Sequence, residues 1–292
     1  MNRGKYRIII PFLAPPLILY LTFVIYPYVQ AMYISLTSWR GLTPNPEFIG
    51  LANFERMLGD NLFWNALGNN VKYLISLPVI TISISLFLAF VLTQRAVRFS
   101  GFYRITFFFP QVMSLVAIGV LWSFVYHPTI GILNAALGVF GVSDPIAWLG
   151  NPDTALGAVG AVVIWQAVGF YMVLFIAGME SIPSYLYEAA IIDGANRWQL
   201  FWKITLPLLW DTTRTAMVFL AIGAVDMFAI VQTMTEGTPN HSTEVLAYYL
   251  YERAFISSRF GYATAIAVAL FLLVLTLSIL ILRFTRRETA EY

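Results

Sequence analysis

Six long runs of apolar residues are the feature that most limits how this 292-residue chain can fold. A helix that crosses a bilayer needs roughly 20 mostly apolar residues, and each run reaches that length. Charged residues make up only 11% of the chain, whereas an ordinary soluble domain has about 25%. We therefore predict an all-α integral membrane protein, a six-helix polytopic bundle that forms a single transmembrane domain over residues 1–292. The predicted spans are about 9–37, 71–94, 105–126, 155–179, 213–235 and 262–284.

Lysine and arginine residues predict the orientation, because they accumulate in the cytoplasmic segments of membrane proteins. Most of the 17 fall in alternate segments that include both chain ends and residues 180–212. These are Arg3, Lys5, Arg7, Arg95, Arg98, Arg104, Arg197, Lys203, Arg214, Arg283, Arg286 and Arg287. The opposite set is Arg40, Arg56, Lys72, Arg253 and Arg259. We therefore expect both termini and residues 180–212 to be cytoplasmic.

Several kinds of chemistry are excluded by residues that the sequence lacks. There is no cysteine, which excludes disulfides, thiolate metal sites and cysteine nucleophiles. His127 and His241 both fall in predicted loops and leave little basis for a metal site. No G-x-x-x-x-G-K-[ST] phosphate loop is present, so any ATP that drives this protein must bind to another chain. A net charge of +2 is too small to indicate nucleic-acid binding. We expect no catalytic residue, metal or cofactor in this chain.

Residues 180–212 are a compact polar segment between two apolar runs, and they predict a hairpin of two short helices. Ser184 is expected to cap a first helix over about 185–192. Gly194 supplies the left-handed residue that ends it. One face of that helix has small side chains with acidic residues at its edge. It carries Leu186, Ala189, Ala190 and Asp193, with Glu188 beside them. Such a face allows a foreign surface to approach the backbone closely.

The second helix of the hairpin is predicted over about 197–205, with Asn196 as its cap and Pro207 closing it. Its apolar side suits packing under the chain's own bundle; the residues are Trp198, Phe201, Trp202 and Ile204. From composition alone, an ordinary amphipathic helix lying at the membrane interface explains the hairpin about equally well.

The spacing within the hairpin resembles a known motif. Glu188-Ala189-Ala190, three residues, Gly194, nine residues and then Ile204-x-Leu206-Pro207 is similar to the cytoplasmic EAA loop of permease subunits from binding-protein-dependent ABC importers. The stretches IGLANFERMLGD and STEVLAYYLYERAF also resemble the MalF-type carbohydrate permeases of the MetI-like family. The resemblance covers roughly residues 8–287. Two departures from the family pattern leave the identity of the cargo undecided. They are Gly237-Thr238-Pro239 in place of the usual Gly-Gly-Pro and Phe228-Ala229 in place of the usual Phe-Asp.

This resemblance implies that the chain is half of a sugar channel in a bacterial or archaeal cytoplasmic membrane. The implied partners are a second, MalG-type permease, two ABC ATPase subunits that bind ATP and Mg²⁺, and an extracytoplasmic solute-binding protein. The chain itself is then a transport subunit and not an enzyme. The residues implied to couple it to the ATPase are Glu188, Ala189, Ala190, Asp193, Gly194, Ile204, Leu206 and Pro207.

Polar residues within the spans are candidates for the substrate pathway. Charges inside a span are costly and usually functional, and Asp226 is the clear case. Gln166, Phe170 and Tyr171 lie on the fourth run, where related permeases place substrate contacts. Gln232 lies near the outer end of the fifth run. The alternatives are a structural ion pair for Asp226 and ordinary packing for the aromatic residues.

Other functions remain open at this point. A glycerol-3-phosphate or phosphodiester importer belongs to the same class, although an anionic cargo favours basic residues that these spans lack. An ion-coupled secondary transporter could use Asp226, but such proteins commonly hold internal repeats that are not visible here. An intramembrane enzyme needs more than one lone acid.

Two expectations concern packing. Gly157, Gly160 and Gly169 of the fourth run are expected to allow close contact between helices. Residues 130–141 are expected to form a short helix that lies on the membrane or dips into it.

Overall fold

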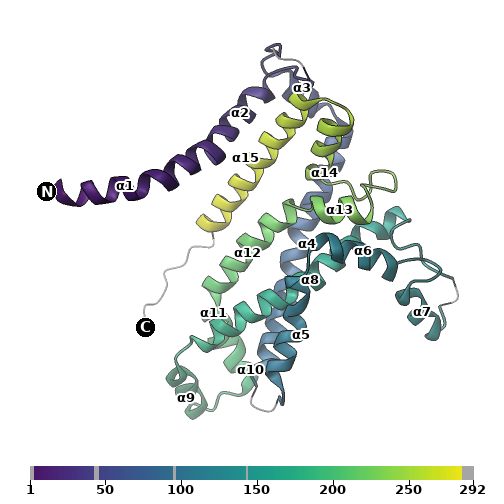
Figure 1. The fold of residues 1–292 in the computed structure, drawn as a ribbon. Helices are drawn as coiled ribbons and strands as arrows, with labels where there is room; N and C mark the ends of the chain where they lie inside the picture. The colour runs from purple at the N-terminus through teal and green to yellow at the C-terminus, as the bar shows by residue number, and fades with distance from the viewer. Residues whose placement is uncertain (1–2, 43–45, 95–96, 143, 285–292) are drawn as a thin grey trace. The chain divides into compact units, whose positions relative to one another are not determined.

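The computed structural model describes residues 3–42, 46–94, 97–142 and 144–284, and this part of the chain is helical (Figure 1). The β-type pairing among these residues is limited to one isolated bridge, between Thr37 and Phe48. The predicted all-α fold is therefore confirmed. Arg95, Arg286 and Arg287, which contribute to the predicted orientation, lie outside the described residues.

The helices follow one another with short connections. They are α1 (Arg3–Tyr20), α2 (Tyr26–Ser35), α3 (Ala52–Leu58), α4 (Asn61–Leu92), α5 (Ser100–Val112), α6 (Leu115–Val125), α7 (Ile132–Val139), α8 (Pro152–Glu180), α9 (Ser184–Ile192), α10 (Arg197–Leu200), α11 (Leu206–Leu208), α12 (Trp210–Val225), α13 (Phe228–Met234), α14 (Leu246–Tyr251) and α15 (Phe260–Phe284). Three π-helical turns, Leu21–Ile25, Phe201–Thr205 and Glu252–Ile256, continue adjoining helices. The short helix expected within 130–141 is α7.

Four helices in the described part of the chain are long and apolar enough to cross a membrane, or up to six if each of two bent helix pairs is one span. The four are Pro11–Ser35, Asn61–Leu92, Pro152–Glu180 and Phe260–Arg283. They correspond to the first, second, fourth and sixth predicted spans. The second begins earlier than predicted, because α4 continues through a polar first segment that contains four asparagines.

The predicted span 105–126 is broken. α5 and α6 meet at an angle of 101°, so residues 105–126 do not form the straight helix that their composition suggests. Pro110 lies in the last turn of α5, and Met113 and Ser114 after it have extended backbone. A proline has no N–H to donate, and the helix ends within a turn of it.

The predicted span 213–235 is also interrupted. α12 ends at Val225, and the backbone leaves the helical conformation at Asp226 and Met227 before α13 begins. At its other end α12 joins the helix Arg197–Leu208 with a bend of 64°. The acid that the sequence places in mid-helix therefore sits at a helix break.

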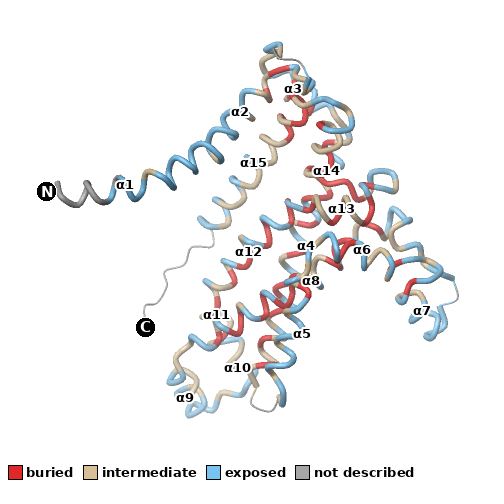
Figure 2. The backbone as a smooth tube through the Cα atoms, viewed as in Figure 1, coloured by how far each residue is buried: buried red, intermediate tan, exposed pale blue. Residues whose placement is uncertain are grey.

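The chain divides into two compact units. The first consists of Met1–Phe63 and Tyr249–Leu272, and the second of Trp64–Tyr248 and Leu273–Tyr292. In the second unit α8 lies at the centre and packs against α5, α6, α12 and α13. Figure 2 shows buried backbone along α8, where Met172 and Phe175 are fully buried.

Two of the three glycines expected to allow close contact bring α8 close to its neighbours. A Cβ atom on Gly169 would overlap the backbone of Phe107 on α5, and one on Gly160 would come within 3.0 Å of the Tyr73 ring on α4. Gly157 has open space where a Cβ would lie. The expected close contact is therefore confirmed at Gly169 and Gly160 and is wrong at Gly157.

In the first unit a carboxylate joins residues distant in sequence. Asp60, just before α4, accepts hydrogen bonds from the hydroxyls of Tyr249 and Tyr262, the latter at 2.6 Å. Burial raises the pKa of Asp60, but these two hydroxyls and backbone N–H groups, including that of Leu62, outweigh burial, and the net pKa lies below its ordinary value. The Arg253 guanidinium lies over the Tyr249 ring, 4.6 Å from its centre. This cluster ties the start of α4 to α14 and α15 within the unit.

Substitution of the α8 glycines tests the close approach to α5. We expect Gly169→Ala to lower the free energy of unfolding by about 1–3 kcal/mol, because the added methyl must displace backbone. Gly157→Ala is the matched control, with the same residue change on the same helix, and should be neutral or slightly stabilising. Thermal unfolding of the purified protein in detergent measures both. Equal stability of the two variants would contradict the described packing.

The Asp60 cluster predicts a pH-dependent stability. A carboxyl whose pKa is lowered on folding stabilises the fold above its unfolded pKa of about 3.9 and loses that contribution as the pH falls through the folded value. We expect Asp60→Asn to cost about 1–2 kcal/mol at pH 7 and progressively less below about pH 4. Thermal unfolding at pH 7 and pH 3 measures this difference. The exposed Glu55→Gln is the control, and a penalty for Asp60→Asn that does not change with pH would refute the role of charge.

Candidate functional site

The first helix of the hairpin ends as its sequence predicts. Gly194 has φ +82°, the left-handed conformation that glycine adopts without strain. The N–H of Ala195 donates to the carbonyl of Ala190 at 2.9 Å, which closes the end of α9 as in a Schellman motif. The predicted start is wrong by one residue: α9 begins at Ser184, Pro183 is the N-cap, and no side-chain capping bond forms there.

The second helix begins as predicted and ends differently. Asn196 accepts a hydrogen bond from the N–H of Gln199, and the Gln199 side chain accepts one from the N–H of Asn196, both at 2.9 Å. This reciprocal pair is a capping box. Pro207 does not close the helix, because a π-helical turn over Phe201–Thr205 carries the chain into α11. The hairpin thus runs directly into the bend before α12.

Two contacts attach the hairpin to the rest of the second unit, and a third joins its own two arms. The Phe201 ring packs edge-on against Phe90 of α4, with 4.9 Å between ring centres. The hydroxyls of Tyr187 and Thr205 are 3.0 Å apart and join the two arms of the hairpin. Arg197 donates to the Gln94 side chain at 3.4 Å. A cavity of about 750 Å³ lies between these elements.

The apolar side of the second helix is only partly used. Phe201 packs on the bundle as expected, and Ile204 is half-buried. Trp198 is 65% exposed and Trp202 is exposed as well, so the expectation that they pack under the bundle is wrong. The rings of Trp198, Phe201 and Trp202 contact one another, and a π-helical turn begins at Phe201. Helical periodicity read from sequence assumes a regular turn and misses this change.

The face that resembles a coupling motif is open. Glu188, Ala189, Asp193 and Gly194 are exposed, and Ala190 is half-buried. Ile191 and Ile192 beside them are also exposed, the latter to 86%. Ile204 and Leu206 are half-buried and Pro207 is exposed. The hairpin therefore presents small side chains bordered by acids and uncovered isoleucines.

Four of the five residues proposed for the substrate pathway line one pocket. Gln166, Phe170 and Tyr171 of α8 lie around a cavity of about 300 Å³, with Asp226 at the end of α12. The rings of Phe170 and Tyr171 stand perpendicular to each other, 5.2 Å apart at their centres. The pocket therefore combines aromatic faces, an amide and one carboxylate. The fifth residue, Gln232 on α13, is half-buried and is not among its lining residues.

The structure adds residues that sequence reasoning missed. Gln111, at the end of α5, and Leu115, at the start of α6, line the same pocket, together with Phe219 of α12. Gln111 follows Pro110 inside an apolar run, and this proline–amide pair is the one local signal that could have indicated it. Both helix breaks of the second unit therefore border the cavity. Among the described residues, Asp226 is the one charged residue in its lining.

Asn70 holds the break at which Asp226 lies. Its side chain is 2% exposed and donates to the carbonyls of Ala224 and Val225, at 3.1 and 3.4 Å. The Asn70 carbonyl oxygen accepts the N–H of Leu246 at 2.8 Å. These carbonyls lose their helical N–H donors where α12 ends, and the buried Asn70 amide donates hydrogen bonds to them instead. One side chain of α4 thus fixes the end of α12 beside the pocket.

Comparison with known proteins gives the family. A family model described as "Binding-protein-dependent transport system inner membrane component" matches residues 71–289, which extend through both compact units. The chain belongs to this family of transport-system membrane components. The expectation drawn from the hairpin motif is thereby confirmed at the level of the family.

Individual relatives agree with the family assignment. The diacetylchitobiose uptake system permease protein NgcF of Streptomyces coelicolor is 40% identical over 87% of this chain and 75% of that protein. The sn-glycerol-3-phosphate transport system permease protein UgpA of Agrobacterium fabrum is 33% identical over 88% of each chain. A solved bacterial ABC transporter involved in the import of alginate has the same fold, with a TM-score of 0.87 over 98% of this chain and 97% of that one, at 22% identity.

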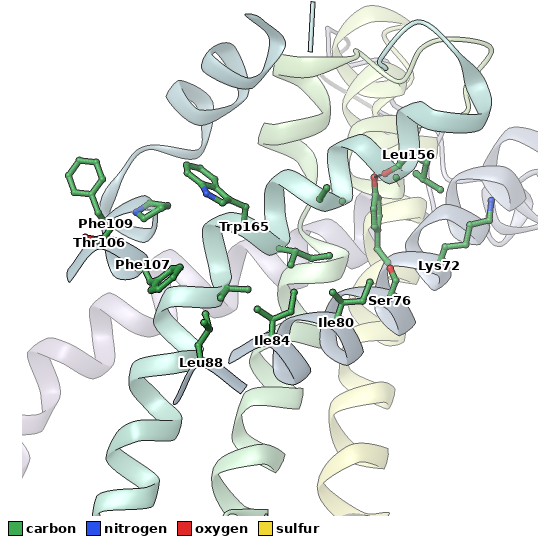
Figure 3. Close-up of a pocket in the computed structure, with 17 residues that line it drawn as sticks. Lys72, Ser76, Ile80, Ile84, Leu88, Thr106, Phe107, Phe109, Leu156 and Trp165 are labelled. Carbon is green, nitrogen blue, oxygen red and sulfur yellow. Dashed lines mark hydrogen bonds between the residues drawn. The ribbon is translucent and has the colours of Figure 1, made fainter. Parts of the chain in front are cut away.

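This binding-protein-dependent membrane component has a second cavity in the same unit that contains none of the predicted pathway residues. It measures about 950 Å³ and is bordered by α4, α5 and α8. Figure 3 shows Ser76, Ile80 and Ile84 in sequence along α4, with Lys72 beyond them and Trp165 on α8. Its lining is mostly apolar.

Proposed function

We propose that this chain is one of two membrane subunits of an ATP-driven importer for a sugar or oligosaccharide, and that it forms half of the translocation pathway. A second, MalG-type permease completes the pathway. Two ABC ATPase subunits bind ATP and Mg²⁺ and hydrolyse the ATP, and an extracytoplasmic solute-binding protein delivers the cargo. The chain itself carries no catalytic residue. The observation that carries this proposal is the exposed hairpin at 184–208.

The hairpin suits a mechanical contact with another protein. Ala189 is exposed and Ala190 half-buried, so a partner can come close to the α9 backbone, while Glu188 and Asp193 offer charge at the border. The uncovered Ile192 adds apolar area for the same contact. Small residues beside exposed aliphatic side chains suit contact with another protein better than contact with water or lipid headgroups alone. Family membership supports a partner that supplies the ATP site.

The fold supports a route from the hairpin to the pocket. The hairpin joins the end of α8 at Glu180 to the start of α12 at Trp210, and these two helices pack together. Gln166 lies about 21 Å along α8 from Glu180, and Asp226 lies about 24 Å along α12 from Trp210, at 1.5 Å per residue. A displacement of the hairpin by the ATPase therefore moves both walls of the pocket. In this way nucleotide-driven motion can open or close the cargo site.

The pocket favours a neutral, hydroxylated cargo. Phe170 and Tyr171 offer ring faces for sugar rings, and Gln111, Gln166 and Asp226 offer hydrogen-bonding groups. Asp226 is the one charged group in the lining, and it repels phosphates and uronates. This argues against the runner-up, a glycerol-3-phosphate or phosphodiester importer, unless the second permease supplies cations. The similarity to NgcF supports a sugar, and the similarity to UgpA keeps the anionic cargo as the rival to be tested.

The proposed orientation places the hairpin and both termini in the cytoplasm. It is supported by the excess of lysine and arginine in those segments. A cytoplasmic hairpin is also what contact with an ATPase requires. An ion-coupled secondary transporter is disfavoured, because the chain belongs to a family of binding-protein-dependent components.

A glycine substitution tests coupling. We expect Gly194→Asp to insert normally but to lose the ATPase, because an aspartate strains the left-handed backbone and projects into the contact face. ATPase that co-purifies with the complex should fall at least about tenfold, and ATP-dependent uptake with it, for the loss of about 1.4 kcal/mol or more of contact energy. Gly50→Asp is the matched control, since Gly50 also has positive φ and open space at Cβ. Full ATPase retention in Gly194→Asp would refute the coupling role.

Substitutions in the pocket test the cargo site. Loss of a hydrogen bond to cargo should reduce uptake about tenfold for Gln166→Leu, and more for Asp226→Asn if the carboxylate is used. Uptake by the reconstituted complex is measured with a neutral disaccharide and with glycerol-3-phosphate. Gln232→Leu, a polar residue outside the pocket lining, is the control and should transport normally. Saturable uptake of glycerol-3-phosphate alone would establish the rival cargo, and unchanged sugar uptake in both pocket variants would remove the pocket from the pathway.

A further inference from the structure

Three arginines converge on a polar pocket in the first compact unit. Arg40, Arg56 and Arg259 line a cavity of about 670 Å³. They are three of the five basic residues in the segments predicted to lie outside, where lysine and arginine are otherwise sparse. Ser38, Ser257, Ser258 and Tyr262 add hydroxyl groups to the lining, and Trp39, Ile49 and Asn53 also belong to it. The pocket lies outside the hairpin and the cargo site and is unrelated to either.

The backbone around this pocket is fixed independently of the arginines. The buried Asn53 amide donates to the carbonyls of Ser35 and Thr37, at 2.9 and 2.8 Å. The N–H of Gly261 donates to the carbonyl of Trp39 at 2.9 Å, which joins the segment after α2 to the first turn of α15. The backbone that frames the pocket is therefore held by hydrogen bonds that do not involve the arginine side chains.

The described residues supply no ion pair to the arginines of this pocket. No carboxylate among the described residues lies within 4.0 Å of the guanidinium groups of Arg40, Arg56 or Arg259. The carboxylate of Asp60 is occupied by Tyr249 and Tyr262 instead. All three arginine side chains are exposed. Three like charges around one concave site favour an anionic ligand that bridges them.

The position of the pocket along the chain places it at the depth of lipid headgroups. Its residues 38–40 follow the end of the apolar helix Pro11–Ser35, and its residues 257–259 come immediately before Phe260–Arg283. Headgroups occupy the layer directly beyond the ends of the spans. Phe255 and Ile256 beside the pocket are each 65% exposed and provide apolar surface next to it. A solute-binding protein approaches from the water and has no need of that surface.

We propose that this pocket binds the phosphate group of an anionic phospholipid. Arg40, Arg56 and Arg259 hold the phosphodiester, the serine hydroxyls donate to its free oxygens, and the acyl chains leave along Phe255 and Ile256. In the proposed orientation the lipid comes from the outer leaflet. The bound lipid anchors the first unit at the membrane surface. This site is additional to the transport function and does not depend on which cargo is carried.

The test uses the full-length chain in detergent with added lipid. Phosphatidylglycerol should raise the unfolding temperature and remain bound in native mass spectrometry, whereas phosphatidylcholine should do neither. Replacing the three arginines together by glutamine should weaken phosphatidylglycerol binding at least about tenfold, since each basic residue contributes to attraction of anionic lipid. Lys72→Gln, on the same predicted side but outside the pocket, should bind phosphatidylglycerol as wild type does. Far-UV circular dichroism without lipid confirms that the triple variant is folded.

Two further arms distinguish the source of the anion. Inorganic phosphate should compete with phosphatidylglycerol only weakly, because it lacks the acyl chains; protection by phosphate alone, equal to that by the lipid, would overturn the proposal in favour of a free-anion site. The assembled complex is also reconstituted in vesicles of phosphatidylcholine with and without phosphatidylglycerol. If the triple variant weakens stimulation of the ATPase by a loaded binding protein equally in both vesicles, the pocket receives a protein carboxylate and the lipid proposal fails. Unchanged phosphatidylglycerol binding in the triple variant also refutes it.

Discussion

The buried amide of Asn70 is the interaction on which the second compact unit depends. A backbone that leaves the helical conformation within a membrane exposes carbonyls that neither lipid nor a neighbouring turn can satisfy. Asn70 donates to the carbonyls of Ala224 and Val225 and accepts from the N–H of Leu246, so one side chain offsets the interruption of α12. The adjacent Asn69 donates to the carbonyls of Ser242 and Glu244. The asparagines in the first segment of α4 therefore provide hydrogen-bond partners for irregular backbone elsewhere in the unit.

The interruption in turn gives the pocket its chemistry. A continuous helix through Asp226 would point its backbone groups along its own axis and offer the cavity only side chains. Both α5 and α12 end at the cavity. Gln111 and Asp226 therefore border it from two helix ends, and Gln166 borders it from the continuous helix α8. Close packing of α8 on α5 at Gly169 keeps the unbroken helix in place beside the two broken ones. Rigid and irregular elements are thus combined at the site where a cargo must be bound and released.

Local signals were read correctly from the sequence, whereas long-range ones were not. The turn at Gly194 and the capping box at Asn196 follow from the residues next to them, and the apolar runs follow from composition. The break at Asp226 depends on Asn70, more than 150 residues away, and hydropathy averaged over a window does not register continuity. The sequence indicates Gln166, Phe170, Tyr171 and Asp226 only as separate candidates, and the fifth candidate, Gln232, is not among the lining residues of their pocket. Trp198 is exposed and its ring contacts those of Phe201 and Trp202, which the apolar pattern alone does not indicate.

The π-helical turn at Phe201–Thr205 has a consequence for how the hairpin can move. Such a turn holds one residue more than the α-helical turn it replaces, and one residue corresponds to about 100° of rotation about the helix axis. If the π-helical turn converts to an α-helical turn or back, Pro207 and the bend after it rotate together about the helix axis. The length of the helix then changes very little. A displacement of α9 can therefore rotate α12 about its axis as well as translate it.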